Sequence, residues 1–115
     1  MNRVGKEGEE LALKFLKDKG FRVLERNYRT PIGEIDIIAR DGNTLVFIEV
    51  KTRSDMSFGS PFESVTQRKR DKIHKTALWY IKGLGREPAA RFDVLSIDLQ
   101  DGRTVIEHIK DAFEI

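Results

Sequence analysis

The fold is decided by residues 33–51, which read GEIDIIARDGNTLVFIEVK. Two runs in it, 35–38 and 45–50, are rich in β-branched, aromatic and aliphatic residues, the composition of buried strands. Between them, Asp-Gly-Asn at 41–43 is a turn signal, so the stretch predicts a β-hairpin. Three charged side chains stand among these apolar runs, where an unpaired charge is costly: Asp36, Glu49 and Lys51.

The position of the turn decides how these charges meet. A two-residue turn on residues 42–43 places Asp36 directly opposite Glu49. A turn on residues 41–42 makes the two carboxylates diagonal neighbours on one face, still about 7 to 8 Å apart. Because side chains alternate with a period of two, Lys51 shares the face of Glu49 in both cases. Either hairpin therefore gathers one polar patch: Glu34, Asp36, Glu49 and Lys51.

Two carboxylates this close repel each other, and one takes up a proton unless a cation shares the site. Mg²⁺ prefers oxygen ligands and keeps several waters, so we expect Asp36, Glu49 and the backbone carbonyl of Val50 to suffice for it. Beside the ion, Lys51 would orient an attacking water or stabilise charge on a phosphate, the arrangement for metal-assisted phosphodiester hydrolysis. The alternative is a Glu–Lys ion pair in a buried or edge strand, with Asp36 in a polar turn network.

A basic helix is expected at residues 64–82. Apolar residues recur there at helical spacing, while six lysines and arginines stand against one aspartate, a local charge of +5. Backbone phosphates are the natural partner of such a face, although a solvated helix surface is the alternative. The residues before it, 52–63, lack periodicity and predict an exposed loop, in which we expect Arg53 to contact phosphate and Phe58 to wedge against a base or cap the core.

A first helix is expected at residues 5–19. Its apolar stripe contains Leu11, Ala12, Phe15 and Leu16. Glu9 falls at the edge of this stripe, on the side that would face a sheet, whereas Glu7 and Glu10 lie off it. The alternative for Glu9 is a place near a helix N-terminus, where acids favour the dipole by about 0.3 to 1 kcal/mol each.

Composition bounds the rest. With 115 residues, 39% of them hydrophobic, the chain suits one domain, residues 1–115. The lack of cysteine excludes disulfides and thiolate metal sites. No segment approaches about 18 consecutive apolar residues and the first residues are charged, so we expect a soluble, cytoplasmic protein with no membrane contact. A net charge of +2 and a pI near 9.0 are mildly basic, so a nucleic-acid partner depends on where the charge lies.

The predicted elements are helix 5–19, strands 21–29, 33–40 and 44–52, helix 64–82, and strands 90–99 and 103–110. Three consecutive strands between helices favour an antiparallel meander that a crossover helix joins to a further strand, giving an α/β sandwich around a mixed sheet. We expect Asp93 to be structural and paired with Arg91. Nothing in the sequence pairs His74 or His108 as ligands or as a general base.

The order Asp36, hairpin, Glu49-Val50-Lys51 resembles the active-site signature of the PD-(D/E)xK nuclease superfamily. One departure is that Ile35 stands where the superfamily name has a proline. Nearly the whole chain is similar to the YraN-like family of small bacterial endonucleases, through the motifs at residues 5–9, 20–21, 26–29, 33–36, 47–53, 58–59 and 91–93.

This resemblance implies a restriction endonuclease-like αβββαβ core, a central mixed sheet flanked by helices. The family is similar to archaeal Holliday junction resolvases, whose metal-site roles would fall on Glu9, Asp36, Glu49 and Lys51. It implies a DNA endonuclease acting on branched, damaged or duplex DNA with Mg²⁺ or Mn²⁺, with RNA still open, and a homodimer if two symmetric cuts are made. A non-catalytic nucleic-acid-binding accessory protein on the same fold is the second hypothesis.

The resemblance also bears on the basic helix. Related nucleases place a Gln or Lys of this helix beside the site, which would fall on Gln67 and Lys69. We expect the neighbouring cations to bind the nucleic-acid backbone as well: Arg68 and Arg70.

Overall fold

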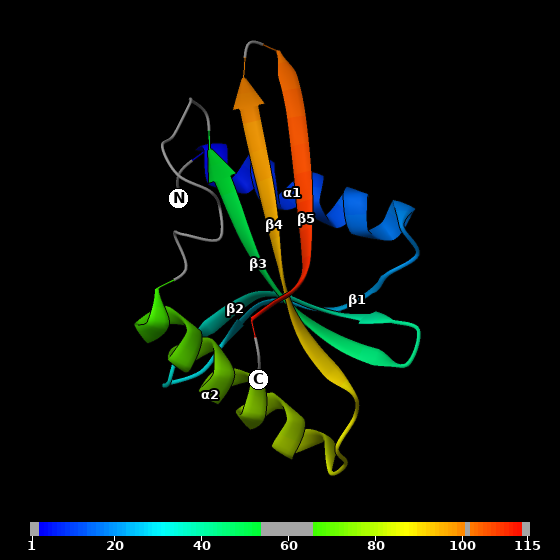
Figure 1. Cartoon of the computed structure of the whole chain (residues 1–115), viewed down its shortest axis with the longest axis vertical. Helices are drawn as coiled ribbons and strands as arrows, with labels where there is room; N and C mark the ends of the chain where they lie inside the picture. The colour runs from blue at the N-terminus through cyan, green and yellow to red at the C-terminus, as the bar shows by residue number, and fades with distance from the viewer. Residues whose placement is uncertain (1–2, 54–65, 101, 114–115) are drawn as a thin grey trace.

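The computed structural model describes residues 3–53, 66–100 and 102–113, which form five strands and two helices (Figure 1). In chain order they are α1 (Arg3–Asp18), β1 (Arg22–Arg29), β2 (Glu34–Asp41), β3 (Thr44–Arg53), α2 (Gln67–Leu84), β4 (Ala90–Gln100) and β5 (Arg103–Phe113). This confirms the predicted α/β fold and its αβββαβ order. Neither helix of the described chain is long and apolar enough to cross a bilayer.

The helix boundaries differ from the prediction. Helix α1 begins at Arg3, two residues early. Helix α2 begins at Gln67 rather than at 64, because Thr66 is extended (φ −69°, ψ 164°) and its hydroxyl accepts the Lys69 N–H at 3.3 Å as an N-cap. Most of the predicted loop, including Phe58, lies outside the described residues.

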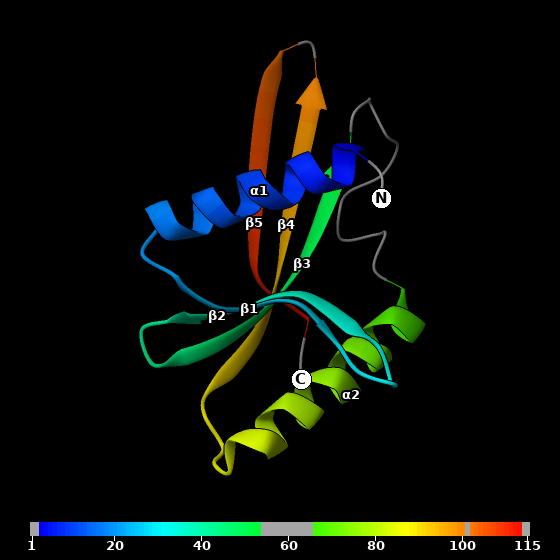
Figure 2. The ribbon, with the colours of Figure 1, turned by 180° about the vertical axis from the view of Figure 1, so that it is seen from behind.

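The sheet has the order β1-β2-β3-β4-β5. Strands β1 to β3 form the predicted antiparallel meander, and α2 carries the chain to β4, which pairs with β3 in parallel. Strand β5 returns antiparallel to β4 and forms an edge. Helix α1 crosses the upper half of the molecule, behind β3, β4 and β5 in Figure 1 and in front of them in Figure 2, whereas α2 lies in the lower half in both views.

The β2–β3 hairpin has the first of the two predicted registers. Asp41 pairs with Thr44 across a two-residue turn, whose Gly42 has a positive φ of 62° that glycine adopts without strain. Pairing then runs to Ile37–Ile48 and stops there. Beyond this pair the strands diverge: β3 continues beside β4, while β2 stays with β1 (Figure 1).

The two helices cover opposite faces of the sheet. Ala12 and Leu16 of α1 pack on one face, in a cluster with Ile37, Ile48 and Leu95. Ile73 and Ala77 of α2 pack on the other, in a cluster with Phe47, Phe92 and Val94. Full burial of a leucine, isoleucine, valine or phenylalanine side chain contributes roughly 1.5 to 3 kcal/mol. Since strand residues alternate, Glu49 and Lys51 share the α2 face with Phe47.

Candidate carboxylate and lysine site

The site begins where the β2–β3 ladder ends. In a continued ladder the Val50 N–H would face Ile35, but the strands have separated there, and the Asp36 carboxylate accepts this N–H instead, at 2.8 Å. The N–H and C=O of one strand residue point to the same side, so the Val50 carbonyl also faces the gap. The Asp36 side chain thus replaces the backbone of Ile35 as the partner of Val50, and this bond holds it against β3 beside Glu49.

Glu49 joins two elements. Its Oε1 lies 3.2 Å from the Lys51 Nζ of β3 and 3.4 Å from the Lys69 Nζ of α2. The Glu49 side chain is 13% exposed and that of Lys69 is 44% exposed. One partly buried carboxylate oxygen therefore holds two ammonium groups, one from the sheet and one from the basic helix.

The pKa of Asp36 is raised, as expected for a carboxylate that lies close to another. Burial raises the pKa of Asp36 from 3.8 to about 7; the Glu49 charge adds to this, the Val50 N–H opposes it, and the Glu9 charge adds further. Near neutral pH the pair of carboxylates is therefore poised to take either a proton or another cation.

The two lysines are shifted in opposite directions. Burial lowers the pKa of Lys51, and the adjacent Lys69 lowers it further, while Glu49 opposes both. For Lys69, burial also lowers the pKa, but its bonds and charge contacts with Lys51, Glu49 and Asp36 outweigh burial and raise it. Lys51 is thus the more readily deprotonated of the two amines.

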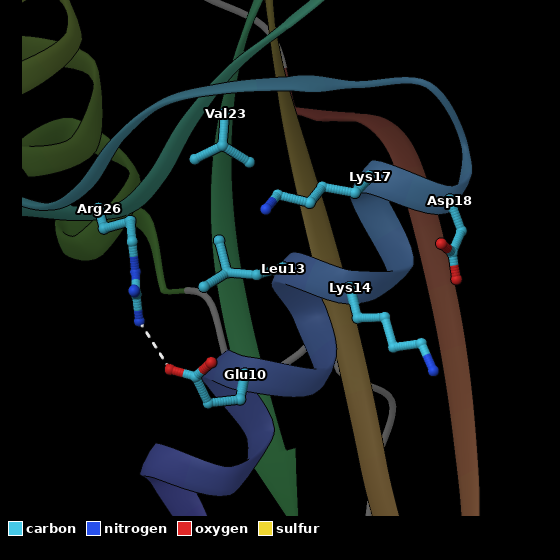
Figure 3. A pocket seen from close by; sticks show the side chains of 7 residues that line it. All are labelled: Glu10, Leu13, Lys14, Lys17, Asp18, Val23 and Arg26. Atoms are coloured by element: carbon cyan, nitrogen blue, oxygen red, sulfur yellow. Dashed lines mark hydrogen bonds and ion pairs between the residues drawn. The ribbon is translucent and has the colours of Figure 1, made fainter.

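Helix α1 contributes Glu9 rather than its neighbour. Glu9 is half-buried, and its charge reaches Asp36. Glu10 bonds Arg26 of β1 at 2.9 Å, on the rim of a separate groove between α1 and β1 (Figure 3). Because α1 begins at Arg3, its first turn contains no acid, which weakens the helix-dipole explanation for Glu9.

A hollow of about 320 Å³ opens beside the carboxylates. It is lined by β2, β3, α2 and the turn before β2, through Gly33, Glu34, Asp36, Glu49, Lys69, Lys72 and Ile73. Glu34 is turned partly outward, to Arg29 at 3.3 Å. Lys72 was expected only as one charge among several, yet it lines the hollow three residues after Lys69, because residues at this spacing share a helix face.

The other predicted phosphate contacts are not among the described residues that line this hollow. Gln67 donates to Asp71 at 2.9 Å and, with Arg70, lines a different hollow, so the expectation that Gln67 adjoins the carboxylates is not met. Arg68 is exposed. Arg70 lies over the Phe113 ring, 5.5 Å from its centroid. Arg53 bonds Asp98 of β4 at 2.9 Å.

Ser96 is a polar residue near the site that the sequence did not indicate. It pairs with Lys51 across the parallel β3–β4 register and faces the same side. Ser96 is 1% exposed, and its hydroxyl has no hydrogen-bond partner in the part of the chain that the structure describes. Buried hydroxyls are usually paired, so this one is a candidate site residue. Its only sequence signal is a polar residue within the buried run 94–97.

The donors present suit a hard cation. Over residues 3–53, 66–100 and 102–113, no three His, Cys, Asp or Glu side chains converge closely enough to hold a metal ion. The available set is two carboxylates and the Val50 carbonyl, all oxygen. This fits Mg²⁺, which keeps several waters, better than Zn²⁺, which favours nitrogen and sulfur.

A second polar cluster lies on the α1 face and is structural. The Asp93 side chain is fully buried and accepts from Arg91 at 3.0 Å, as predicted, and from the Asp111 N–H at 3.0 Å. It also lies 2.7 Å from His108 Nε2, a partner for His108 that the sequence did not indicate. This cluster fastens the irregular end of β5 to β4.

These features define a small α/β protein with a five-stranded mixed sheet and a pair of partly buried carboxylates, flanked by lysines, where two strands diverge. The chain belongs to the Uncharacterised protein family UPF0102, whose pattern matches residues 8–97. It is 52% identical over 110 residues to a UPF0102 protein of Thermodesulfovibrio yellowstonii, covering 96% of this chain and 95% of the relative. UPF0102 proteins of Desulfosudis oleivorans (50% identity; 96% and 89% covered) and Geotalea daltonii (53%; 97% and 90%) are similar over comparable lengths.

Proposed function

We propose that this protein is a Mg²⁺-dependent endonuclease that hydrolyses phosphodiester bonds in DNA, of the YraN-like kind within the PD-(D/E)xK superfamily. The observation that carries the proposal is the Asp36 carboxylate, bonded to the Val50 N–H beside Glu49 and its two lysines. A raised carboxylate pKa next to a charged partner in a hollow is the pattern of functional sites.

Each residue has a role in this proposal. Asp36, Glu49 and the Val50 carbonyl would hold the ion, and the charge of Glu9, which acts on Asp36, would add to theirs. When bound, Mg²⁺ supplies Lewis-acid activation of a phosphate and lowers the pKa of a bound water. Lys51 orients the attacking water and stabilises charge developing on the phosphate.

The basic side of α2 supplies the polyanion contact. Lys69 and Lys72 line the hollow, and Arg68 is exposed on the same helix. Cations of this kind bind backbone phosphates without reading sequence. Branched or duplex DNA in the cytoplasm is the proposed substrate, with a homodimer where paired cuts are made.

The test uses labelled duplex, single-stranded and four-way-junction DNA and a matched RNA, with Mg²⁺, Mn²⁺ or chelator. Wild-type protein should cut at least one substrate only when metal is present, and Asp36→Asn should not cut. Asp71→Asn, an exposed acid on α2, is the matched control and should cut normally. Cutting in chelator, or equal cutting by Asp36→Asn, would contradict the proposal.

A nucleic-acid-binding accessory protein is the second candidate. Two observations favour it. The described residues contain no group of three His, Cys, Asp or Glu side chains that could hold a metal ion, and two lysines already neutralise the charge of Glu49. This candidate predicts binding across the panel without cutting under any metal condition.

A further inference from the structure

The contact between Lys69 and Glu49 conflicts with the proposed use of Glu49. Oε1 of Glu49 is shared by Lys51 at 3.2 Å and Lys69 at 3.4 Å. A carboxylate bearing two ammonium groups has little negative charge left for a divalent ion. Metal and lysine therefore compete for the same acid.

The two lysines differ in how easily they can leave. Lys51 is anchored in β3, two residues from Glu49, and its side chain is 20% exposed. Lys69 reaches over from α2 on a flexible stem, and its side chain is 44% exposed. Repulsion from a bound ion would displace the more exposed amine first.

We propose that Lys69 occupies Glu49 in place of the divalent ion, and that metal binding releases Lys69 to a phosphate of the nucleic acid. The inference rests on the proposed function and adds an order of events to it. The hollow beside Glu49 is where the released amine would meet a substrate, because Lys69 and Lys72 both line it.

This exchange couples two binding events. Removing the Lys69 charge should make the metal bind more tightly when no DNA is present, because its competitor is gone. The same change should reduce the gain in DNA affinity that metal produces, since no amine is released. Linkage makes the coupling reciprocal, so both effects have one origin.

The experiment measures Mn²⁺ binding to the whole protein without DNA, by the electron paramagnetic resonance signal of free Mn²⁺. Lys69→Met keeps the stem and removes the charge, whereas Lys69→Arg keeps the charge. Lys72→Met is the matched control, because Lys72 lines the same hollow and forms no ion pair among the described residues. Thermal melting shows that each variant is folded.

We expect Lys69→Met to lower the Mn²⁺ Kd about fivefold or more, and Lys69→Arg and Lys72→Met to stay near wild type. An unchanged or raised Kd in Lys69→Met overturns the inference but leaves the proposed nuclease intact, provided that the wild type binds Mn²⁺. If the wild type binds no Mn²⁺, both fall.

A second measurement follows DNA affinity by fluorescence anisotropy, with Ca²⁺ or chelator. Ca²⁺ is used as a hard cation with the same oxygen preference. Ca²⁺ should tighten DNA binding by the wild type more than by Lys69→Met. Equal tightening would show that metal does not act through Lys69 and would overturn the inference.

Discussion

Lys51, which shares a Glu49 oxygen with Lys69, should affect cleavage much more than DNA binding. Lys51→Ala removes the group proposed to stabilise the transition state, so we expect cleavage to fall about 10²- to 10³-fold or more. DNA binding should change little, because the cations of α2 remain. Single-turnover kinetics measure the cleavage rate, and fluorescence anisotropy measures the affinity for the same DNA. A proportional loss of cleavage rate and DNA affinity would refute this role for Lys51.

The contribution of Asp36 to the free energy of unfolding should be smaller at neutral pH than at acid pH. Its folded pKa of about 7 lies above the ordinary 3.8, so the folded state binds the proton more tightly. Its contribution is therefore most favourable below pH 4 and is lost as pH rises to about 7. Asp36→Asn keeps an oxygen for the Val50 N–H without a charge.

We therefore expect Asp36→Asn to be more stable than wild type at pH 8 by on the order of 2 kcal/mol, and nearly equal at pH 4. Urea unfolding in chelator at both values measures this. Adding Mg²⁺ should stabilise the wild type and not the variant. A variant less stable at pH 8 would mean that Asp36 serves as a structural ion-pair partner.

Asp93 has the opposite pH dependence. Burial raises the pKa of Asp93, but the bonds from His108, Arg91 and the Asp111 N–H outweigh it, and the pKa lies below 3.8. Its stabilisation is complete above about pH 4 and is lost as pH falls through the folded pKa. Asp93→Asn should cost about 2 to 3 kcal/mol at pH 7, because it removes the buried charge that Arg91 and His108 contact and leaves Arg91 with Asp41, at 3.0 Å, as its carboxylate partner among the described residues.

Equilibrium unfolding between pH 2 and pH 7 tests this difference. The gap between wild type and Asp93→Asn should narrow as pH falls below 4. A gap that stays constant to pH 2 would show that the carboxylate charge is not what stabilises the cluster.

At the scale of elements, the position of helix α1 on the sheet depends on a close approach of Gly8 to Thr52 of β3. A Cβ at Gly8 would overlap the Thr52 side chain at the end of β3, so Gly8→Ala must push helix and strand apart. We expect a loss of about 1 to 3 kcal/mol in unfolding free energy, and weaker cleavage because Glu9 moves with the helix. Gly83→Ala is the control: it lies in α2 with open space around it and should be neutral or stabilising by up to about 1 kcal/mol. Equal effects of the two changes would dismiss the packing argument.

The elements themselves were largely predictable, because their signals are local. The two-residue turn at 42–43 and the alternation after it place Asp36 near Glu49 without any distant information. Ser96 beside Lys51, Arg53 on Asp98 and His108 on Asp93 depend instead on how β4 pairs with β3 and β5. No local pattern specifies those registers, so these contacts could not be derived from the sequence.

At the scale of the whole molecule, the net charge of +2 is too small to attract DNA by itself, so the positions of the charged side chains matter. What matters in the proposal is that Lys69 and Lys72 lie beside the carboxylates. The groove between α1 and β1 also carries cations, Lys14 and Lys17 (Figure 3), and it has no lining residue in common with the hollow beside the carboxylates.

Two double variants with the same change in net charge separate position from total charge. Lys69→Ala with Lys72→Ala should reduce the slope of log affinity against log salt by about 1.4 to 1.8, since each released phosphate contact contributes about 0.7 to 0.9. Lys14→Ala with Lys17→Ala should leave the slope unchanged. Anisotropy titrations over a range of salt concentrations measure both, with Ca²⁺ present because Lys69 is expected to leave Glu49 only when metal is bound. Equal slopes in the two variants would mean that the field of the whole protein, rather than the α2 face, attracts the nucleic acid.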